Sequence, residues 1–281
     1  MLEIKKINSL ENPQIKLLKK LGLKKYRQEF GLFCVENLVI IFDALKSGYD
    51  FESLFFTNEF SQKNSEALKI LQKKSETKNF FEIDNKINKS FSSLETPAGI
   101  VAVYKIKEGE VPERNGELEK KVGLRKKGGL KKSDASVYLN GINDPGNLGT
   151  IMRSALAFGF KTLVLDETCA DIYNPKVISA AKDSIFKLNF IFDRNRAWLE
   201  REVVQNNLAL YATDLKGEEN LAKLKGGKNF CLALGSESRG LSEEILKLAA
   251  KKIKIEISSE IESLNVAVAA GILFYHFKAK I

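Results

Sequence analysis

Residues 140–160 read NGINDPGNLGTIMRSALAFGF and join a turn signal to the start of an apolar helix. Asp144, Pro145 and Gly146 predict the turn, because proline fixes φ and aspartate and glycine favour turn conformations. A helix is expected to begin near Asn147. Its apolar residues recur at helical spacing and predict one buried face, made of Leu148, Ile151, Met152, Ala155 and Phe158.

Arg153 falls on the opposite side of this expected helix, together with Thr150. Gly149 allows another backbone to come close. A guanidinium near the free N–H groups of a helix start suits a phosphate or a carboxylate. The alternative is a solvated surface arginine with no specific partner.

The chain after residue 135 alternates strand-like and helix-like segments. Several strand candidates are apolar on both faces, as in a buried parallel sheet. They are SVYLNGI (136–142), KTLVLD (161–166), IFKLNF (185–190), LALYATD (208–214), NFCLALGSE (229–237) and KIKIEI (252–257). Ligands of such sheets bind at the carboxyl ends of the strands.

Two further strand ends carry unusual residues. The stretch LALGSESRGLS (232–242) runs from a strand into Gly235, Glu237 and Gly240, and its spacing differs from a GxGxxG dinucleotide motif. The strand candidate KIKIEI is the other one, and it is expected to end near Ile257. Ser263 or Asn265 then opens a nearly all-apolar helix, which we expect to be buried. Both residues could also serve simply as helix caps.

The first 105 residues predict a smaller α/β domain. GLFCVEN, ESLFFTN, NFFEID and GIVAVYK are its strand candidates, and helical patterns lie between them. Residues 106–134 combine Gly, Lys and Glu without apolar periodicity, so they predict a flexible linker or a basic tether that touches RNA phosphates. We therefore expect a small domain over 1–105, a linker over 106–134 and a second domain over 135–281.

Charge favours a polyanionic partner. The chain has 281 residues, a net charge of +9 and a pI of about 9.2. Residues 1–105 hold 17 basic and 13 acidic side chains, whereas residues 133–281 hold 19 and 18. The first domain and the basic stretch 114–132 are thus expected to attract the polyanion.

Few residues suit metal or nucleophilic chemistry. Cys34, Cys169 and Cys231 are far apart, which fits a reducing cytoplasm and argues against disulfides and structural zinc, so no metal site is predicted. The one histidine, His276, lies far from the polar loop of its helix and is interpreted as a packed or surface residue. No apolar run has the length of a membrane span, and a cytoplasmic protein without membrane contact is expected.

Together, the three strand-end stretches closely resemble the three motifs of the SpoU/TrmH class of SPOUT RNA 2′-O-ribose methyltransferases. The resemblance covers about residues 135–281. More loosely, LFCVENLVIIFDALKSG and ETPAGIVAVYK resemble the small ribosomal-protein-like, RNA-binding domain that often precedes that catalytic domain.

The resemblance implies an α/β fold whose C-terminal parallel sheet is tied in a trefoil knot, and a homodimer that shares its active site. It implies S-adenosylmethionine as the methyl donor, held by knot backbone near Thr213, Gly235, Ile255 and Leu264. The residues that match the family's catalytic and polar positions are Arg153, Asn147, Glu237, Ser263 and Asn265.

Arg153 would either act as a base perturbed by the RNA phosphate or orient the hydroxyl and the phosphate. Two departures from the family pattern affect loop shape rather than catalytic side chains: Glu256 stands within the run that precedes Ser263, and Ser238 follows Glu237.

The resemblance favours rRNA as substrate. The alternatives are a tRNA 2′-O-methyltransferase, a non-catalytic RNA-binding protein on the same scaffold, and a ribosomal-protein-like module joined to an unrelated α/β domain.

Overall fold

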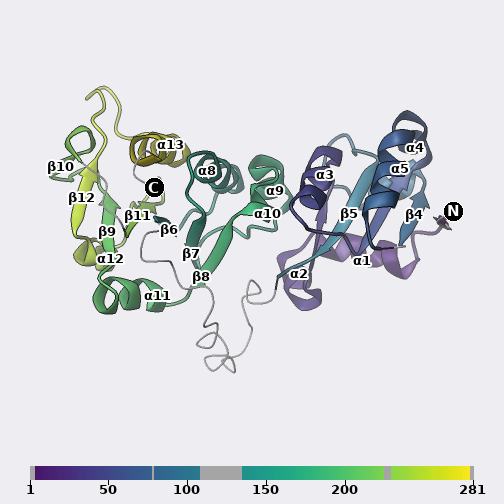
Figure 1. Cartoon of the computed structure of the whole chain (residues 1–281), viewed down its shortest axis with the longest axis horizontal. Helices are drawn as coiled ribbons and strands as arrows, with labels where there is room; N and C mark the ends of the chain where they lie inside the picture. Colours follow the sequence, from purple (N-terminus) through teal and green to yellow (C-terminus); the bar gives the residue numbers. More distant parts are fainter. Residues whose placement is uncertain (1–3, 78, 108–134, 225–228, 279–281) are drawn as a thin grey trace. The chain divides into compact units, whose positions relative to one another are not determined.

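The computed structural model describes residues 4–77, 79–107, 135–224 and 229–278 (Figure 1). Most of the stretch 106–134, which the sequence predicts to be a linker, lies outside them. The chain forms two compact units. The first contains residues 1–113 and 173–186, and the second contains residues 114–172 and 187–281. None of the helices in the described ranges is long and apolar enough to cross a lipid bilayer.

The first unit is built around a mixed sheet of five strands in the order β1-β4-β3-β5-β2. Strands β1, β4 and β3 run parallel, and β5 is antiparallel to both β3 and β2. Its elements up to residue 105 are β1 (Lys5–Ile7), α1 (Pro13–Leu21), α2 (Lys24–Phe30), β2 (Leu32–Val35), α3 (Leu38–Lys46), β3 (Ser53–Thr57), α4 (Asn58–Lys63), α5 (Ser65–Lys74), β4 (Phe80–Ile83), α6 (Asn85–Phe91) and β5 (Ile100–Lys105).

Helix α1 forms because Asn12 caps its first turn, accepting from the Gln14 N–H at 2.9 Å, and Pro13 occupies its first position. Its apolar stripe, Ile15, Leu18 and Leu21, is buried against the sheet together with residues such as Phe55 and Val101. The lysines of α1 therefore remain outside this core.

Residues 173–186 complete the first unit with α9 (Pro175–Ala181) and most of α10 (Ser184–Lys187). Phe33 packs against Tyr173 with ring centroids 4.6 Å apart, and Tyr104 packs against Phe186 at 5.1 Å. The strand expected over 185–190 is wrong in its first half, because Ile185 and Phe186 are buried from a helical turn. A short apolar run does not distinguish a buried strand from a buried helix.

The second unit contains a sheet of seven parallel strands in the order β10-β12-β9-β11-β6-β7-β8. Its elements are β6 (Ser136–Asn140), α8 (Pro145–Ala157), β7 (Thr162–Asp166), β8 (Asn189–Asp193), α11 (Ala197–Glu200), a π-helical turn (Arg201–Gln205), β9 (Ala209–Thr213), β10 (Glu219–Asn220), a 3₁₀ turn (Leu221–Lys223), β11 (Phe230–Gly235), α12 (Glu243–Leu248), β12 (Lys251–Lys254) and α13 (Val266–Phe277).

Helices cover both faces of this sheet, with α8 and α13 on one face and α11 and α12 on the other (Figure 1). The stripe predicted for α8 is buried except for Phe158, which ends the helix and is partly exposed. Helix α13 differs from the buried helix expected from its composition. It buries residues such as Leu273 and Phe274, while Val268, Ile272 and Tyr275 are 52%, 37% and 61% exposed.

Candidate active site at the carboxyl edge of the second sheet

Strands β9, β11 and β6 are neighbours and parallel, so their carboxyl ends meet at one edge of the sheet. Gly235 at the end of β11 pairs with Asn140 at the end of β6. Thr213 ends β9 and donates its hydroxyl to the Ala233 carbonyl at 3.0 Å. Two of the predicted donor-binding residues, Thr213 and Gly235, therefore lie on neighbouring strands at this edge.

The loop after β11 folds back sharply onto the end of its own strand. The Gly240 N–H donates to the Ser236 carbonyl at 2.8 Å, and Gly240 has a φ of +66°. A Cβ on Gly235 would lie 2.1 Å from the Gly240 carbonyl carbon and 2.3 Å from the Leu241 nitrogen. This close backbone approach requires glycine at position 235.

Three polar side chains from distant parts of the chain meet at this edge, and we call Asn147, Glu237 and Asn265 the amide–carboxylate cluster. The Asn265 amide donates to the Asn147 Oδ1 at 2.9 Å and also to the Glu237 Oε1. The Asn147 amide donates to the same Glu237 oxygen at 3.3 Å. The three strand-end stretches singled out in the sequence thus form one hydrogen-bonded group.

Helix caps hold this cluster in place. Asp144 caps α8 by accepting from the Asn147 N–H at 2.7 Å, and Asn265 caps α13 by accepting from the Ala267 and Val268 N–H groups. Glu237 accepts a further bond from the Val266 N–H at 3.1 Å. Its negative charge therefore lies at the N-terminus of α13, where the helix dipole stabilises it.

Arg153 is exposed on α8, as its position off the apolar stripe predicts. Within the described ranges its side chain forms no hydrogen bond or ion pair, so its guanidinium donors remain available. Ser263 is exposed in the loop before α13, and no side-chain hydrogen bond joins it to the cluster among the described residues. Ile255 and Leu264 are partly buried in the segment between β12 and α13.

A second polar group at the same edge was not predicted. The Asn140 amide donates to Asp166 at 2.6 Å, and the Asn140 Oδ1 accepts from the Ser242 N–H at 3.2 Å. Asp166 also accepts from the Gly141 N–H at 3.1 Å. The sequence did contain a hint of this group, because β6 and β7 each end in a polar residue. Only the parallel pairing of these strands brings the two residues together.

The cysteines and the histidine take no part in this site. Burial raises the pKa of Cys231 to about 12, and burial aided by Glu36 raises the pKa of Cys34 to about 12, so both thiols stay neutral. A His276 ring nitrogen lies 2.9 Å from the Leu224 carbonyl oxygen. No group of metal-ligating side chains occurs in the part of the chain that the structure describes.

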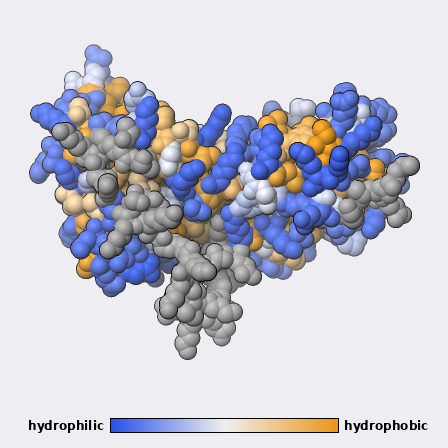
Figure 2. Space-filling view, in the orientation of Figure 1, coloured by the Kyte–Doolittle hydropathy of each residue, from blue (hydrophilic) through white to orange (hydrophobic). Residues whose placement is uncertain are grey.

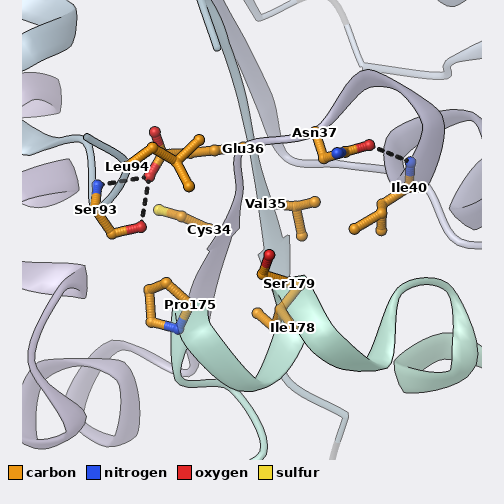
Figure 3. A pocket seen from close by; sticks show the side chains of 10 residues that line it. All are labelled: Cys34, Val35, Glu36, Asn37, Ile40, Ser93, Leu94, Pro175, Ile178 and Ser179. Carbon is orange, nitrogen blue, oxygen red and sulfur yellow. Dashed lines mark hydrogen bonds between the residues drawn. The ribbon is translucent and has the colours of Figure 1, made fainter. Parts of the chain in front are cut away.

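The first unit has a small pocket, of about 70 Å³, between β2, the start of α3 and α9 (Figure 3). Glu36 closes one side by accepting from the Ser93 N–H at 3.0 Å and from the hydroxyls of Ser92 and Ser93. This volume holds only a few water molecules, and the Glu36 carboxylate is already bonded to the two serines. We therefore find no reason to assign a ligand to it.

Residues 134–275 match the model of the SpoU rRNA Methylase family, and residues 12–102 match the model of the MRM3-like substrate binding domain. Over 275 residues the chain is 28% identical to the 23S rRNA (guanosine(2553)-2′-O)-methyltransferase RlmP of Bacillus subtilis (strain 168), covering 98% of this chain and 100% of that protein. It is 27% identical to the mitochondrial rRNA methyltransferase 3 of Xenopus laevis, covering 92% of this chain and 71% of that protein.

Solved structures share the fold over nearly the whole length. A crystal structure of an RNA 2′-O ribose methyltransferase is 25% identical, with a TM-score of 0.77 and 98% of each chain covered. The SpoU methyltransferase AviRb from Streptomyces viridochromogenes, solved in complex with AdoMet, gives a TM-score of 0.80 at 21% identity. It covers 96% of this chain and 98% of that one.

Proposed function

Because the chain belongs to the SpoU rRNA methylase family, we propose that it transfers a methyl group from S-adenosylmethionine to a ribose 2′-hydroxyl of RNA. The observation that carries the proposal is the amide–carboxylate cluster, in which Asn147, Glu237 and Asn265 meet at the carboxyl edge of the sheet. Ribosomal RNA is the proposed substrate. The relatives from B. subtilis and X. laevis, whose alignments cover more than nine-tenths of this chain, are both named as rRNA methyltransferases.

The carboxyl edge fits the methyl donor. Gly235 leaves no room for a side chain because the backbone of Gly240 and Leu241 folds back onto it, so this glycine shapes the 236–241 loop at the edge. Gly217 is similarly confined, because a Cβ would lie 2.8 Å from the Ile253 carbonyl carbon. S-adenosylmethionine supplies an electrophilic methyl group on a sulfonium. We assign its binding to the backbone around Thr213, Gly235, Ile255 and Leu264.

The cluster and Arg153 would act on the RNA. Glu237 is held by three donors, so its position is fixed before any substrate binds. Arg153 has no competing partner in the described ranges, and its planar fork can bind the phosphate beside the reactive ribose. We assign Arg153 the role of orienting that phosphate and the hydroxyl, and Ser263 the role of a further polar contact from the loop before α13.

We also propose that the protein is a homodimer through the exposed face of α13. Val268, Ile272 and Tyr275 lie one helical turn apart on this face. The Phe158 ring packs edge-on against Tyr275 with centroids 5.9 Å apart, which extends the apolar surface to the end of α8. Hydrophobic residues reach the surface in the region of α8 and α13 (Figure 2). Contiguous exposed apolar surface of this kind marks protein interfaces.

Three further expectations belong to this proposal. The family's trefoil knot would pass through the segment between β12 and α13, whose end is tied to the β11 loop by the bonds of Glu237 to Asn265 and Val266. RNA binding is assigned to residues 1–105 because of their positive charge and the substrate-binding-domain match over 12–102. A cytoplasmic location stays a prediction from the sequence.

Two measurements test the proposed function. Titration calorimetry should show S-adenosylmethionine binding to the purified chain without RNA. Mapping of ribose methylation in rRNA and tRNA, from cells with and without the protein, should show one rRNA position that depends on it. Absence of donor binding to the folded chain, together with unchanged methylation maps, would refute the methyltransferase assignment and leave the non-catalytic RNA-binding alternative.

A further inference from the structure

Helices α1 and α2, drawn in purple in Figure 1, are rich in basic side chains. Residues 12–30 contain six basic side chains and one acidic side chain. Because Ile15, Leu18 and Leu21 face the core, the lysines of α1 face outward. Lys16 pairs with Glu11 at 2.7 Å. Within the described ranges the other four lysines form no ion pair: Lys19, Lys20, Lys24 and Lys25.

Two aromatic rings lie among these unpaired cations. Tyr26 and Phe30 stack with ring centroids 6.1 Å apart and planes 16° apart. The Lys20 ammonium lies 5.3 Å from the Tyr26 centroid and 5.8 Å from that of Phe30, and the Lys25 ammonium lies 5.6 Å from the Tyr26 centroid. Phe30 is 41% exposed, so part of this ring pair is open to solvent.

A buried arginine fixes this arrangement. Arg27 is 3% exposed, and its Nη1 donates to the Leu21 carbonyl at 2.8 Å. The bond ties α2 to the last turn of α1, so Lys20 of one helix reaches the rings of the other. The two helices that carry the rings and the lysines are therefore joined before any partner binds. We call Lys19, Lys20, Lys24, Lys25, Tyr26 and Phe30 the basic–aromatic face.

We propose that the basic–aromatic face binds an unpaired stretch of the RNA substrate, with a base stacked against the Phe30–Tyr26 ring pair and the lysines on the flanking phosphates. Unpaired bases expose the faces that stack on aromatic side chains, whereas bases inside a duplex do not. The lysines neutralise the phosphates of the same strand. The proposal rests on the proposed function and adds to it where the RNA binds and in what form.

The test measures the affinity of the full chain for a labelled RNA of about 12 nucleotides, a length within the site sizes of single-strand-binding modules. The same strand is also presented as a duplex, and both are followed by fluorescence anisotropy over a salt series. Phe30→Ala should weaken single-strand binding roughly 5- to 100-fold and duplex binding much less. Phe30→Trp should restore it. Because Phe30 is 41% exposed and lies outside the core cluster of the first unit, both variants should fold, and thermal melting checks this.

Removing a lysine charge should change the salt dependence of RNA binding, whereas removing the Phe30 ring should not. Lys20→Gln should reduce the salt dependence of single-strand binding by about 0.7 in log–log slope, whereas Phe30→Ala should leave that slope unchanged. Lys73→Gln and Ile70→Ala, exposed positions on α5, are the matched controls and should bind like wild type.

Equal binding by wild type, Phe30→Ala and Lys20→Gln would overturn the assignment of this face, and so would equal losses for single strand and duplex. Donor binding by the same samples separates this failure from that of the proposed function. A chain that binds neither RNA nor S-adenosylmethionine contradicts both.

Discussion

Asn265 donates its side-chain amide to the Asn147 Oδ1 at 2.9 Å, although the two residues lie 118 positions apart in the sequence. The same amide donates to Glu237, while the Asn265 Oδ1 caps α13. One side chain therefore caps α13 and joins it to the first turn of α8 and to the loop after β11. Because different atoms carry these two tasks, substitutions can separate them.

Asn265→Ser should keep the helix cap and lose the amide donor. We expect its stability to stay within about 0.5 kcal/mol of wild type, because serine and asparagine cap helices about equally well. Asn265→Ala should cost about 1 kcal/mol more, since it also removes the cap. Both should lose methyl transfer, because Glu237 and Asn147 lose their shared donor. Thermal melting and transfer of labelled methyl to total rRNA measure the two effects. Full activity of Asn265→Ser would show that the cluster does not need this amide.

The parts of the fold that depend on local pattern were predictable. The apolar spacing of Leu148, Ile151 and Met152 predicts α8, and the short apolar runs predict β6, β9 and β11. The exposed side of α13 was not predictable, because Val268, Ile272 and Tyr275 are as apolar as the residues it buries. Composition indicates that a helix is apolar, but not how much of it the same chain covers.

The site illustrates the same limit. Its residues stand out at strand ends, but their meeting depends on the strand order β9-β11-β6, and no local feature of the sequence reports that order. The bond between Asn140 and Asp166 was missed for this reason. The grouping of Asn147, Glu237 and Asn265 followed only from the family resemblance, and their catalytic roles stay predictions.

Gly235→Ala should disrupt the donor site. The added methyl would meet the backbone of Gly240 and Leu241, which cannot move aside as a flexible side chain would. We expect a loss of roughly 1–3 kcal/mol in stability, as for other overpacked positions. We also expect at least about tenfold weaker S-adenosylmethionine binding by calorimetry.

The control for Gly235→Ala is Gly22→Ala in the first unit. Gly22 has a φ of −60°, which alanine adopts readily, and its nearest neighbour would be the Lys19 carbonyl oxygen at 3.3 Å. We expect a stability change below about 1 kcal/mol and unchanged donor affinity. Wild-type donor affinity in Gly235→Ala would mean that the donor does not use this loop.

Ile272→Glu should convert the proposed homodimer into a monomer. A carboxylate at the middle of the apolar face of α13 would be desolvated in the interface without a partner. Because Ile272 is 37% exposed in the single chain, the folded monomer should tolerate the change. Light scattering after size-exclusion chromatography gives the mass of each species.

Val204→Glu is the matched control for the dimer, since Val204 is 67% exposed and lies in the π-helical turn rather than on α13. It should remain dimeric. A dimeric Ile272→Glu would place the interface elsewhere, and a monomeric wild type would rule out the homodimer.

Arg153→Ala should abolish methyl transfer while leaving the fold, the oligomeric state and donor affinity near wild type. Arg153 is exposed and lies off the buried stripe of α8, so its truncation opens no cavity. The donor is assigned to Gly235 and the loops beyond it, so its contacts should persist. What is lost is the cation that binds the phosphate and orients the hydroxyl, and we expect transfer to fall roughly 100-fold or more. Arg153→Lys should also transfer methyl groups poorly, because the lysine ammonium does not reproduce the planar, two-pronged guanidinium. Labelled-methyl transfer to rRNA, donor calorimetry and thermal melting are measured on the same samples. Near-wild-type transfer by Arg153→Ala would remove the residue from the mechanism, and a parallel loss of donor binding would make its role structural.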